Sequence, residues 1–329
     1  MMREMKTPEQ VVEGGGLACP DCRGGLQRRN AEIACTTCGL TYQIVDGIPV
    51  LTNSNSEEHD ELDHIADGHG HPAQSFGAGH KARQTAYFDR AALADFEIER
   101  PSGSPELYRF LLTEKFRRSV EPLKGNLDGW TALTVCGGSG MDAEFLAAAG
   151  AAVISSDLSL GAAGRVRERA RRHDLPIQSI VADIEHLPFA DRSVDLVYVH
   201  DGLHHLEDPS AGIAEMARVA RRAVCITEPA AALATSIAIR LRLALEREPA
   251  GNRVARLRPQ AVAAVLQAEG FRVVLAGRYA MYYRHTPGWA MSFLSWRPLL
   301  PLAILGWRFA DRVFGRFGNK LVVVAVRDS

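Results

Sequence analysis

The residues best suited to chemistry in this sequence begin with a glycine loop. It reads Cys136-Gly137-Gly138-Ser139-Gly140 and stands between the apolar run 132–135 and a helical pattern that starts at Met141. Glycine permits a tight turn and lets a ligand approach the backbone closely. Strand, glycine turn and helix follow one another in the order from which nucleotide pockets are built. We therefore predict a cofactor site at this loop.

Two carboxylates at later strand ends extend this site. The predicted strand 152–156 ends at Asp157, which is placed to bind both hydroxyls of a ribose, and the next strand ends at Ala182-Asp183. The loop alone does not identify the cofactor, because residues 138–143 also fit the dinucleotide fingerprint GxGxxA. An NAD-dependent oxidoreductase is therefore an alternative at this point.

The stretch after Asp183 favours a methyl donor. It contains Leu187-Pro188-Phe189 and then D-x-S-V-D-L-V up to residue 197, and residues 85–329 resemble the class I methyltransferases that use S-adenosylmethionine. The resemblance implies an α/β fold, a Rossmann-like sheet with helices on both faces and an antiparallel last strand. The cofactor-binding residues that it implies are Cys136, Gly137, Gly138, Ser139, Gly140, Asp142, Asp157, Leu158, Asp183, Ile184 and His200.

The glycine motif departs from that family at two positions. Thr134 stands where an acidic residue usually opens the motif, and Cys136 stands where its first glycine usually lies. Asp142 could replace the missing carboxylate as the partner of the methionine ammonium group. The alternative role of Asp142 is a buried helix cap.

Four cysteines near the N-terminus have metal-ligand spacing. Cys19 and Cys22 form one CxxC pair, Cys35 and Cys38 form a second, and twelve residues separate the pairs. Two such turns can close a tetrahedral site of four thiolates that suits structural Zn²⁺, with a redox pair as the alternative. Residues 17–52 also resemble the zinc ribbons of the tRNA-methyltransferase activator family, which implies a scaffold that recruits a protein partner.

Two histidines are candidates for catalysis. His204 and His205 follow the predicted strand 194–199, and the carboxyl ends of parallel strands form the ligand crevice. A neutral imidazole can accept a proton near pH 7, which matters only if the methyl acceptor must lose one. The alternative is that one histidine lines the cofactor cleft and the other packs.

The pattern along the chain predicts three parts. We expect a zinc ribbon at residues 1–53, a His/Gly-rich linker at 54–84, and a methyltransferase domain at 85–329 with an aromatic-rich insertion at about 279–317. The linker is expected to be a connector that orders over the site, with a second metal site as the alternative. The insertion should cap the acceptor pocket, or else pack on the sheet or mediate a homodimer. Helices are predicted at 81–97, 106–120, 160–173 and 260–269, and strands at 223–227, 271–275 and 321–326. The arginines of 165–172 are expected to form a solvent-exposed helix face.

Composition narrows the function. The chain has 329 residues, 47% of them hydrophobic, and a formal net charge of -1, so it offers no long-range field for polyanions and a nucleic-acid substrate is disfavoured. The N-terminus lacks a signal-peptide pattern and no run of about 20 apolar residues predicts a transmembrane segment, so we expect a cytoplasmic protein. We predict methyl transfer from S-adenosylmethionine to a small molecule of lipid-like, sugar or secondary-metabolite type. The alternatives are an RNA methyltransferase that uses the ribbon for recruitment, and a non-catalytic scaffold that binds the cofactor.

Overall fold

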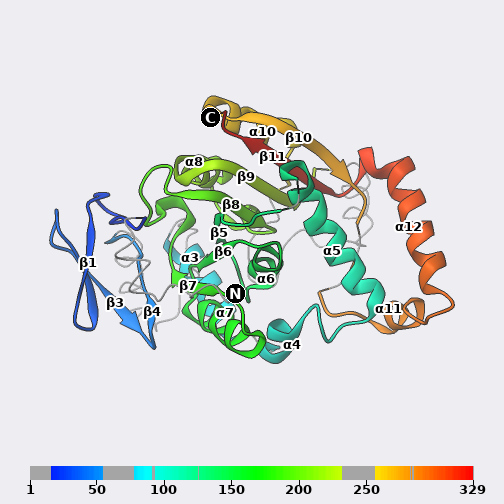
Figure 1. The fold of residues 1–329 in the computed structure, drawn as a ribbon, viewed down its shortest axis with the longest axis horizontal. Helices are drawn as coiled ribbons and strands as arrows, with labels where there is room; N and C mark the ends of the chain where they lie inside the picture. The colour runs from blue at the N-terminus through cyan, green and yellow to red at the C-terminus, as the bar shows by residue number, and fades with distance from the viewer. Residues whose placement is uncertain are drawn as a thin grey trace, which may run out of the picture.

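The centre of the molecule is a mixed β-sheet (Figure 1). The computed structural model describes residues 16–54, 78–90, 93–124, 126–231, 256–281, 283 and 285–328. The strands are β5 (Thr131–Val135), β6 (Ala152–Asp157), β7 (Ile177–Val181), β8 (Val194–His200), β9 (Ala220–Pro229), β10 (Arg272–Tyr279) and β11 (Lys320–Val326), in the order β10-β11-β9-β8-β5-β6-β7. Strands β5 to β9 run parallel, and β11 lies antiparallel between β10 and β9. The predicted fold class and the antiparallel last strand are confirmed.

Helices cover both faces of this sheet because its strands are apolar on both sides. Leu133 and Val135 of β5 join the core cluster beneath α8 and α10, whereas their neighbour Ala132 faces the cluster formed with α5 and α6. The helices are α3 (Ala78–Asp89), α4 (Ala94–Glu99), α5 (Glu106–Val120), α6 (Met141–Ala148), α7 (Leu160–His173), α8 (Pro209–Val219), α10 (Pro259–Ala268), α11 (Trp289–Leu294) and α12 (Leu300–Phe314). The predicted helices 106–120 and 160–173 have these exact bounds.

The single helix predicted over 81–97 is wrong. The chain forms α3 and α4 instead, separated by a break after residue 89. At the break, Asp89 Oδ1 accepts hydrogen bonds from Ser159 Oγ at 2.6 Å and from the Gly161 backbone N–H at 2.8 Å. These bonds satisfy the first turn of α7, so a tertiary contact overrides the local helical pattern.

Residues 16–54 form a small antiparallel sheet, which we call the four-cysteine module. Its strands are β1 (Leu26–Arg29), β2 (Glu32–Cys35), β3 (Thr41–Val45) and β4 (Ile48–Pro49). The module docks on the edge of the central sheet, where the Leu51 N–H donates to the Val181 carbonyl of β7 at 2.8 Å. Ala18 donates in the same way to Pro188 at 3.0 Å, so backbone bonds fix the module at two points. The predicted linker 54–84 lies largely outside the described residues; its last seven residues belong to α3.

The aromatic-rich insertion between β10 and β11 contains α11 and α12. These helices form the outer edge of the molecule at the end opposite to the four-cysteine module (Figure 1). The inner side of α12 packs on α5, with Trp307 edge-on to Phe110. Among the described helices, none has the length and apolarity that a bilayer-spanning segment needs.

Candidate functional site

A cavity of about 1210 Å³ opens at the carboxyl ends of the parallel strands. Twelve of the predicted site residues line it, namely Cys136, Gly137, Gly138, Ser139, Asp142, Asp157, Leu158, Asp183, Ile184, His200, His204 and His205. Gly140 is not among the described residues that line the cavity. It precedes α6 with φ 81°, and a Cβ there would lie 3.2 Å from Val166 on α7, so the structure gives this glycine a packing role.

The two central glycines of the loop are required for different reasons. A Cβ on Gly137 would come within 2.3 Å of Ser155 Oγ on β6, a distance that real contacts do not reach. Gly138 has φ 53°, and nothing lies within 4 Å of the position that its Cβ would occupy. Gly137 therefore lets the loop approach the sheet, while Gly138 leaves an open cradle at the cavity.

Asp157 ties this loop to the end of β6. Its Oδ2 accepts the Gly138 N–H at 2.9 Å and its Oδ1 accepts the Ser159 N–H at 2.9 Å. Burial raises the pKa of Asp157 above its usual value, although these two hydrogen bonds act in the opposite direction. The carboxylate is thus held in one orientation at the mouth of the loop.

A cluster of charged groups occupies the wall beyond the loop. His200 Nδ1 lies 2.9 Å from Asp142 Oδ1, and His200 Nε2 lies 3.1 Å from Asp201 Oδ2. Burial raises the pKa of Asp142 to about 7. Burial also opposes ionisation of Asp201, but the ammonium groups of Lys115 and Lys320, at 2.9 and 2.6 Å, hold the pKa of Asp201 below its usual range. Asp142 therefore sits beside a histidine in the first turn of α6, where negative charge also favours the helix.

His204 and Glu228 form a buried pair at the same edge. Glu228 follows Thr227 in β9 and is fully buried. Its Oε1 accepts the N–H groups of Gly202 and Leu203, both at 2.7 Å, and its Oε2 lies 2.8 Å from His204 Nδ1. A carboxylate on Nδ1 fixes the orientation of the imidazole and directs Nε2 as the basic nitrogen. The His205 ring lies tilted beside this ring with 4.2 Å between the centroids, and the His205 backbone carbonyl accepts from Gln84 at 3.1 Å.

Helix α3 lies across the cavity and closes one side of it. Lys81 Nζ lies 2.6 Å from Asp183 Oδ2 and 2.5 Å from Glu185 Oε2. Burial opposes the charge on Lys81, but the two carboxylates raise the pKa of its ammonium group. Phe88 packs edge-on to the His205 ring. The segment before residue 85 thus contributes directly to the cavity wall.

The expectation that the arginines of α7 form a solvated face is wrong for two of them. Arg165 and Arg169 are buried, and Arg169 is fully inaccessible. Arg165 Nε donates to Ser139 Oγ at 3.1 Å, Arg169 Nε donates to the Ser139 carbonyl at 2.8 Å, and Arg169 also forms an ion pair with Glu144. The reason is that a guanidinium group carries several N–H donors in a rigid arrangement, so it can donate hydrogen bonds to the polar atoms of the glycine loop. Both arginines brace the glycine loop.

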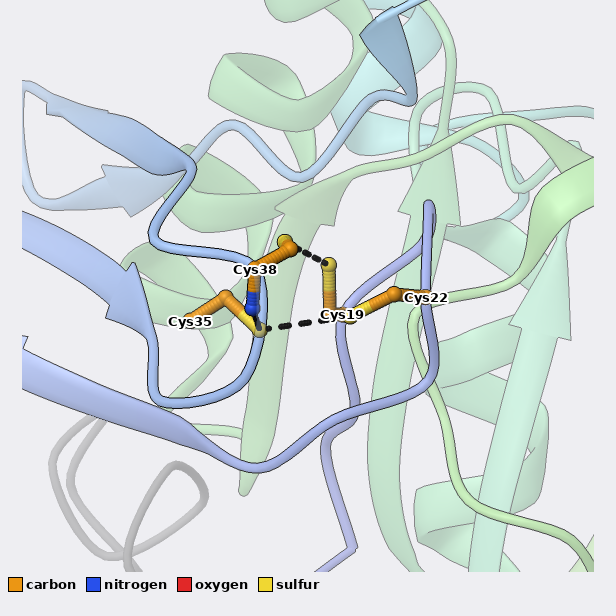
Figure 2. A group of neighbouring side chains, drawn as sticks. All are labelled: Cys19, Cys22, Cys35 and Cys38. Atoms are coloured by element: carbon orange, nitrogen blue, oxygen red, sulfur yellow. Dashed lines mark hydrogen bonds between the residues drawn. The ribbon is translucent and has the colours of Figure 1, made fainter.

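The four cysteines of the module point toward one another from two loops (Figure 2). Their sulfur atoms all lie within 4.8 Å of one another, with Cys19 Sγ 3.8 Å from Cys38 Sγ and Cys22 Sγ 3.5 Å from Cys35 Sγ. A tetrahedron of sulfurs at about 2.3 Å from a zinc ion has edges of about 3.8 Å, so the spacing fits that metal. Burial opposes ionisation of Cys35, but the backbone N–H groups of Cys38 and Thr37 lower the pKa of its thiol to about 6.

The comparisons with known proteins concern the central sheet and its fold. Residues 133–225 match the family model of a methyltransferase domain. The fold resembles magnesium protoporphyrin IX methyltransferase of Synechocystis PCC 6803, solved with bound S-adenosylhomocysteine, with a TM-score of 0.52, 19% identity, and coverage of 76% of this chain and 100% of that one. The described sheet has the class I methyltransferase fold.

Two named relatives are more similar in sequence over a shorter stretch. The demethylmenaquinone methyltransferase of Renibacterium salmoninarum is 39% identical over 109 residues, which are 33% of this chain and 44% of that protein. The enzyme of the same name from Corynebacterium urealyticum is 42% identical over 119 residues, which are 36% of this chain and 46% of that protein. The chain therefore spans about half the length of these relatives.

Several residues of this methyltransferase fold were missed in the sequence. Glu228 lies at the carboxyl end of β9 and Asp201 directly follows β8, so the rule that singled out Asp157 and His204 also applies to them. Lys115 gives no such signal, because it lies within the regular pattern of α5 and only the packing of α5 against β9 and β11 brings it to Asp201. Tyr283, whose hydroxyl accepts from Lys115 at 3.0 Å, comes from the insertion and reaches the cavity for the same reason.

Proposed function

We propose that this protein transfers the methyl group of S-adenosylmethionine to a small, lipid-like acceptor of the quinone class. The observation that carries the proposal is the hydrogen bond from the Gly138 N–H to the Asp157 carboxylate. It places an open glycine loop and a buried carboxylate side by side in one cavity. The names of the sequence relatives support an acceptor of the quinone class. The cavity volume leaves room for both a nucleoside and an acceptor.

The residues at the cavity fit this methyl donor. Gly138 and its neighbours would hold the methionine end, Asp157 would bind the ribose hydroxyls, and Asp183 with Ile184 would frame the adenine. Asp142 beside His200 would take the ammonium group in place of the acidic residue that Thr134 replaces. Lys81 forms an ion pair with Asp183 and would hold α3 over the nucleoside end.

Catalysis in this proposal depends on positioning and on one proton. The sulfonium of the donor supplies an activated methyl group, so the protein must chiefly align the acceptor and exclude water. His204 would accept the proton that a phenolic oxygen or a ring carbon of the acceptor loses, and Glu228 would stabilise the resulting imidazolium. His205 would pack against His204 and orient α3 through Gln84.

The four-cysteine module is proposed to be a zinc ribbon. A closed shell of four thiolates leaves no position for water, so the metal would be structural. Tyr42 supports the shell, because its hydroxyl donates to Asp21 at 2.8 Å and lies 2.9 Å from Cys19 Sγ. We also propose that the module ends near residue 53 and that the methyltransferase domain extends to the C-terminal strand.

Calorimetric titration tests this proposal. S-adenosylmethionine and S-adenosylhomocysteine should bind, NAD should not, and Asp157→Ala should abolish binding. Asp95→Ala, at an exposed carboxylate on α4, is the matched control and should bind normally. Labelled methyl transfer to a demethylmenaquinone analogue then tests the acceptor. Binding of NAD alone would overturn the proposal, and donor binding without transfer to any quinone would overturn the acceptor class.

A further inference from the structure

The insertion carries an apolar surface that the site does not use. Leu302, Leu305 and Phe309 on the outer side of α12 are each 65% exposed. On the preceding segment Trp289 is 83% exposed and Trp296 is 61% exposed. Large exposed side chains that gather in this way mark an interaction surface, whereas single exposed apolar residues are ordinary.

The inner side of α12 is apolar too, and it is firmly packed. Trp307 Nε1 donates to the Ala280 carbonyl at 3.2 Å, and Asp311 on the same helix forms an ion pair with Arg118 at 2.7 Å. A helix that is apolar on two opposite sides normally has both sides covered. Among the described residues, only the inner side of α12 has packing partners. The outer side is therefore suited to contact with a further apolar partner or with lipid.

The charges around this surface indicate whether a second protein or a lipid bilayer covers it. Residues 289–317 contain the exposed arginines Arg297, Arg308, Arg312 and Arg316. Asp311 is the only acidic residue in this stretch, and Arg118 and the Ala280 N–H already bind its carboxylate. Arg312 lies three residues beyond Phe309, so the positive charge borders the apolar side chains on the same helix face. Self-association across a two-fold axis would bring two sets of these arginines together, whereas an anionic lipid surface would neutralise them.

We propose that α11 and α12 form a membrane-docking surface that binds the face of an anionic lipid bilayer. Leucine, phenylalanine and tryptophan enter the boundary between headgroups and acyl chains, and the arginines bind lipid phosphates, as in other amphipathic helices that lie in a membrane surface. Exposed tryptophans suit this depth because their rings combine an apolar body with a polar N–H.

The docking surface is also connected to the cavity. Met281, Tyr283 and His285 line the cavity and immediately precede α11 in the chain. Tyr108 on α5 donates from its hydroxyl to the His285 carbonyl at 2.9 Å, which fixes this connection. Docking through α11 and α12 would therefore hold this side of the cavity near the lipid surface. This inference goes beyond the proposed methyl transfer and does not depend on it.

Sedimentation with vesicles tests the docking surface in the full chain without a methyl donor. Vesicles of phosphatidylcholine with phosphatidylglycerol should bind the protein, and vesicles without the anionic lipid or at high salt should bind it much less. The variant Leu302→Ser/Leu305→Ser/Phe309→Ser should weaken binding about tenfold or more, since it removes three side chains from the apolar phase. The matched control Leu40→Ser/Val274→Ser changes exposed apolar residues elsewhere and should bind like the native chain.

Brominated lipids provide a second measurement that does not depend on the fold of the triple variant. They should quench the tryptophan fluorescence of the bound protein, and Trp289→Phe/Trp296→Phe should lose most of the quenching while it still binds. Equal vesicle binding by the triple variant would overturn the proposal. So would a native dimer that ignores vesicles and becomes a monomer in the triple variant. Either failure would leave donor binding in solution unaffected, so it is distinguishable from failure of the methyltransferase proposal.

Discussion

The pair of Glu228 with His204 gives the sharpest test of the site. Replacing Glu228 by alanine removes the acceptor of three buried hydrogen bonds, those from Gly202, Leu203 and His204. A buried donor without a partner costs about 1 to 3 kcal/mol, and this change leaves three such donors. We therefore expect Glu228→Ala to lower the free energy of unfolding by about 3 to 5 kcal/mol, a large part of the stability of a typical domain.

Glu228→Gln separates stability from the proposed proton transfer. Its side-chain oxygen can still accept both backbone N–H groups, but its amide donates to His204 Nδ1 and so forces the proton onto Nε2. The expected loss of stability is only about 1 to 2 kcal/mol. A histidine with its proton on Nε2 cannot act there as a base, so the turnover number should fall by about 10² to 10⁴ if His204 accepts a proton. Binding of S-adenosylmethionine should be unchanged.

Three measurements on each variant test this reasoning, namely urea unfolding, calorimetric donor binding and labelled methyl transfer. Glu215→Gln is a matched control. This glutamate accepts a hydrogen bond from the Leu187 N–H at 3.0 Å and forms an ion pair with Arg218, but it does not line the cavity. The control should lose some stability and retain its turnover. Native turnover in Glu228→Gln would refute the role of His204, and a stable Glu228→Ala protein would refute the energetic argument.

Three further predictions concern other parts of the molecule. Burial raises the pKa of Asp142 to about 7 from an unfolded value of 3.8, so the folded protein keeps this proton to a higher pH than the unfolded chain does. The free energy of unfolding should therefore fall as the pH rises from about 4 to 7. Urea titrations of Asp142→Asn should lack that part of the fall. One zinc ion per chain should be found by metal analysis, lost in Cys22→Ser and retained in Cys225→Ser, whose thiol is buried in the central sheet. Gly137→Ala should destabilise the fold by about 1 to 3 kcal/mol, because the added Cβ clashes with β6. Gly138→Ala should cost only about 1 kcal/mol of left-handed backbone strain but should weaken donor binding in calorimetry. Equal effects of the two changes would contradict the geometry.

Sequence patterns predicted the parts of this molecule that local physics determines. The bounds of α5 and α7 follow from apolar periodicity, and the cavity residues at 157 and 183 follow from their places at the carboxyl ends of parallel strands, whereas residue 200 was expected from the family resemblance. The sheet order could be expected only through the family resemblance, because β11 pairs with strands far from it in the chain.

Other features that sequence reasoning missed depend on tertiary contacts. The break between α3 and α4 exists because Asp89 caps a different helix, and Arg165 and Arg169 are buried because the glycine loop needs donors. A single arginine in a helical pattern looks the same whether it faces water or a loop, so no local signal distinguishes the two cases.

The unusual start of the glycine motif has a physical explanation in the neighbouring strand. Thr134 is buried, and its hydroxyl donates to Ser155 Oγ at 2.9 Å, while Ser156 Oγ donates to the Thr134 carbonyl at 3.1 Å. A carboxylate at residue 134 would place a charge in this neutral hydroxyl network, where burial without a cation is costly. Asp142 supplies a carboxyl group instead, in the first turn of α6 with His200 as its partner. The proposed ammonium site would thus lie on the helix instead of the strand.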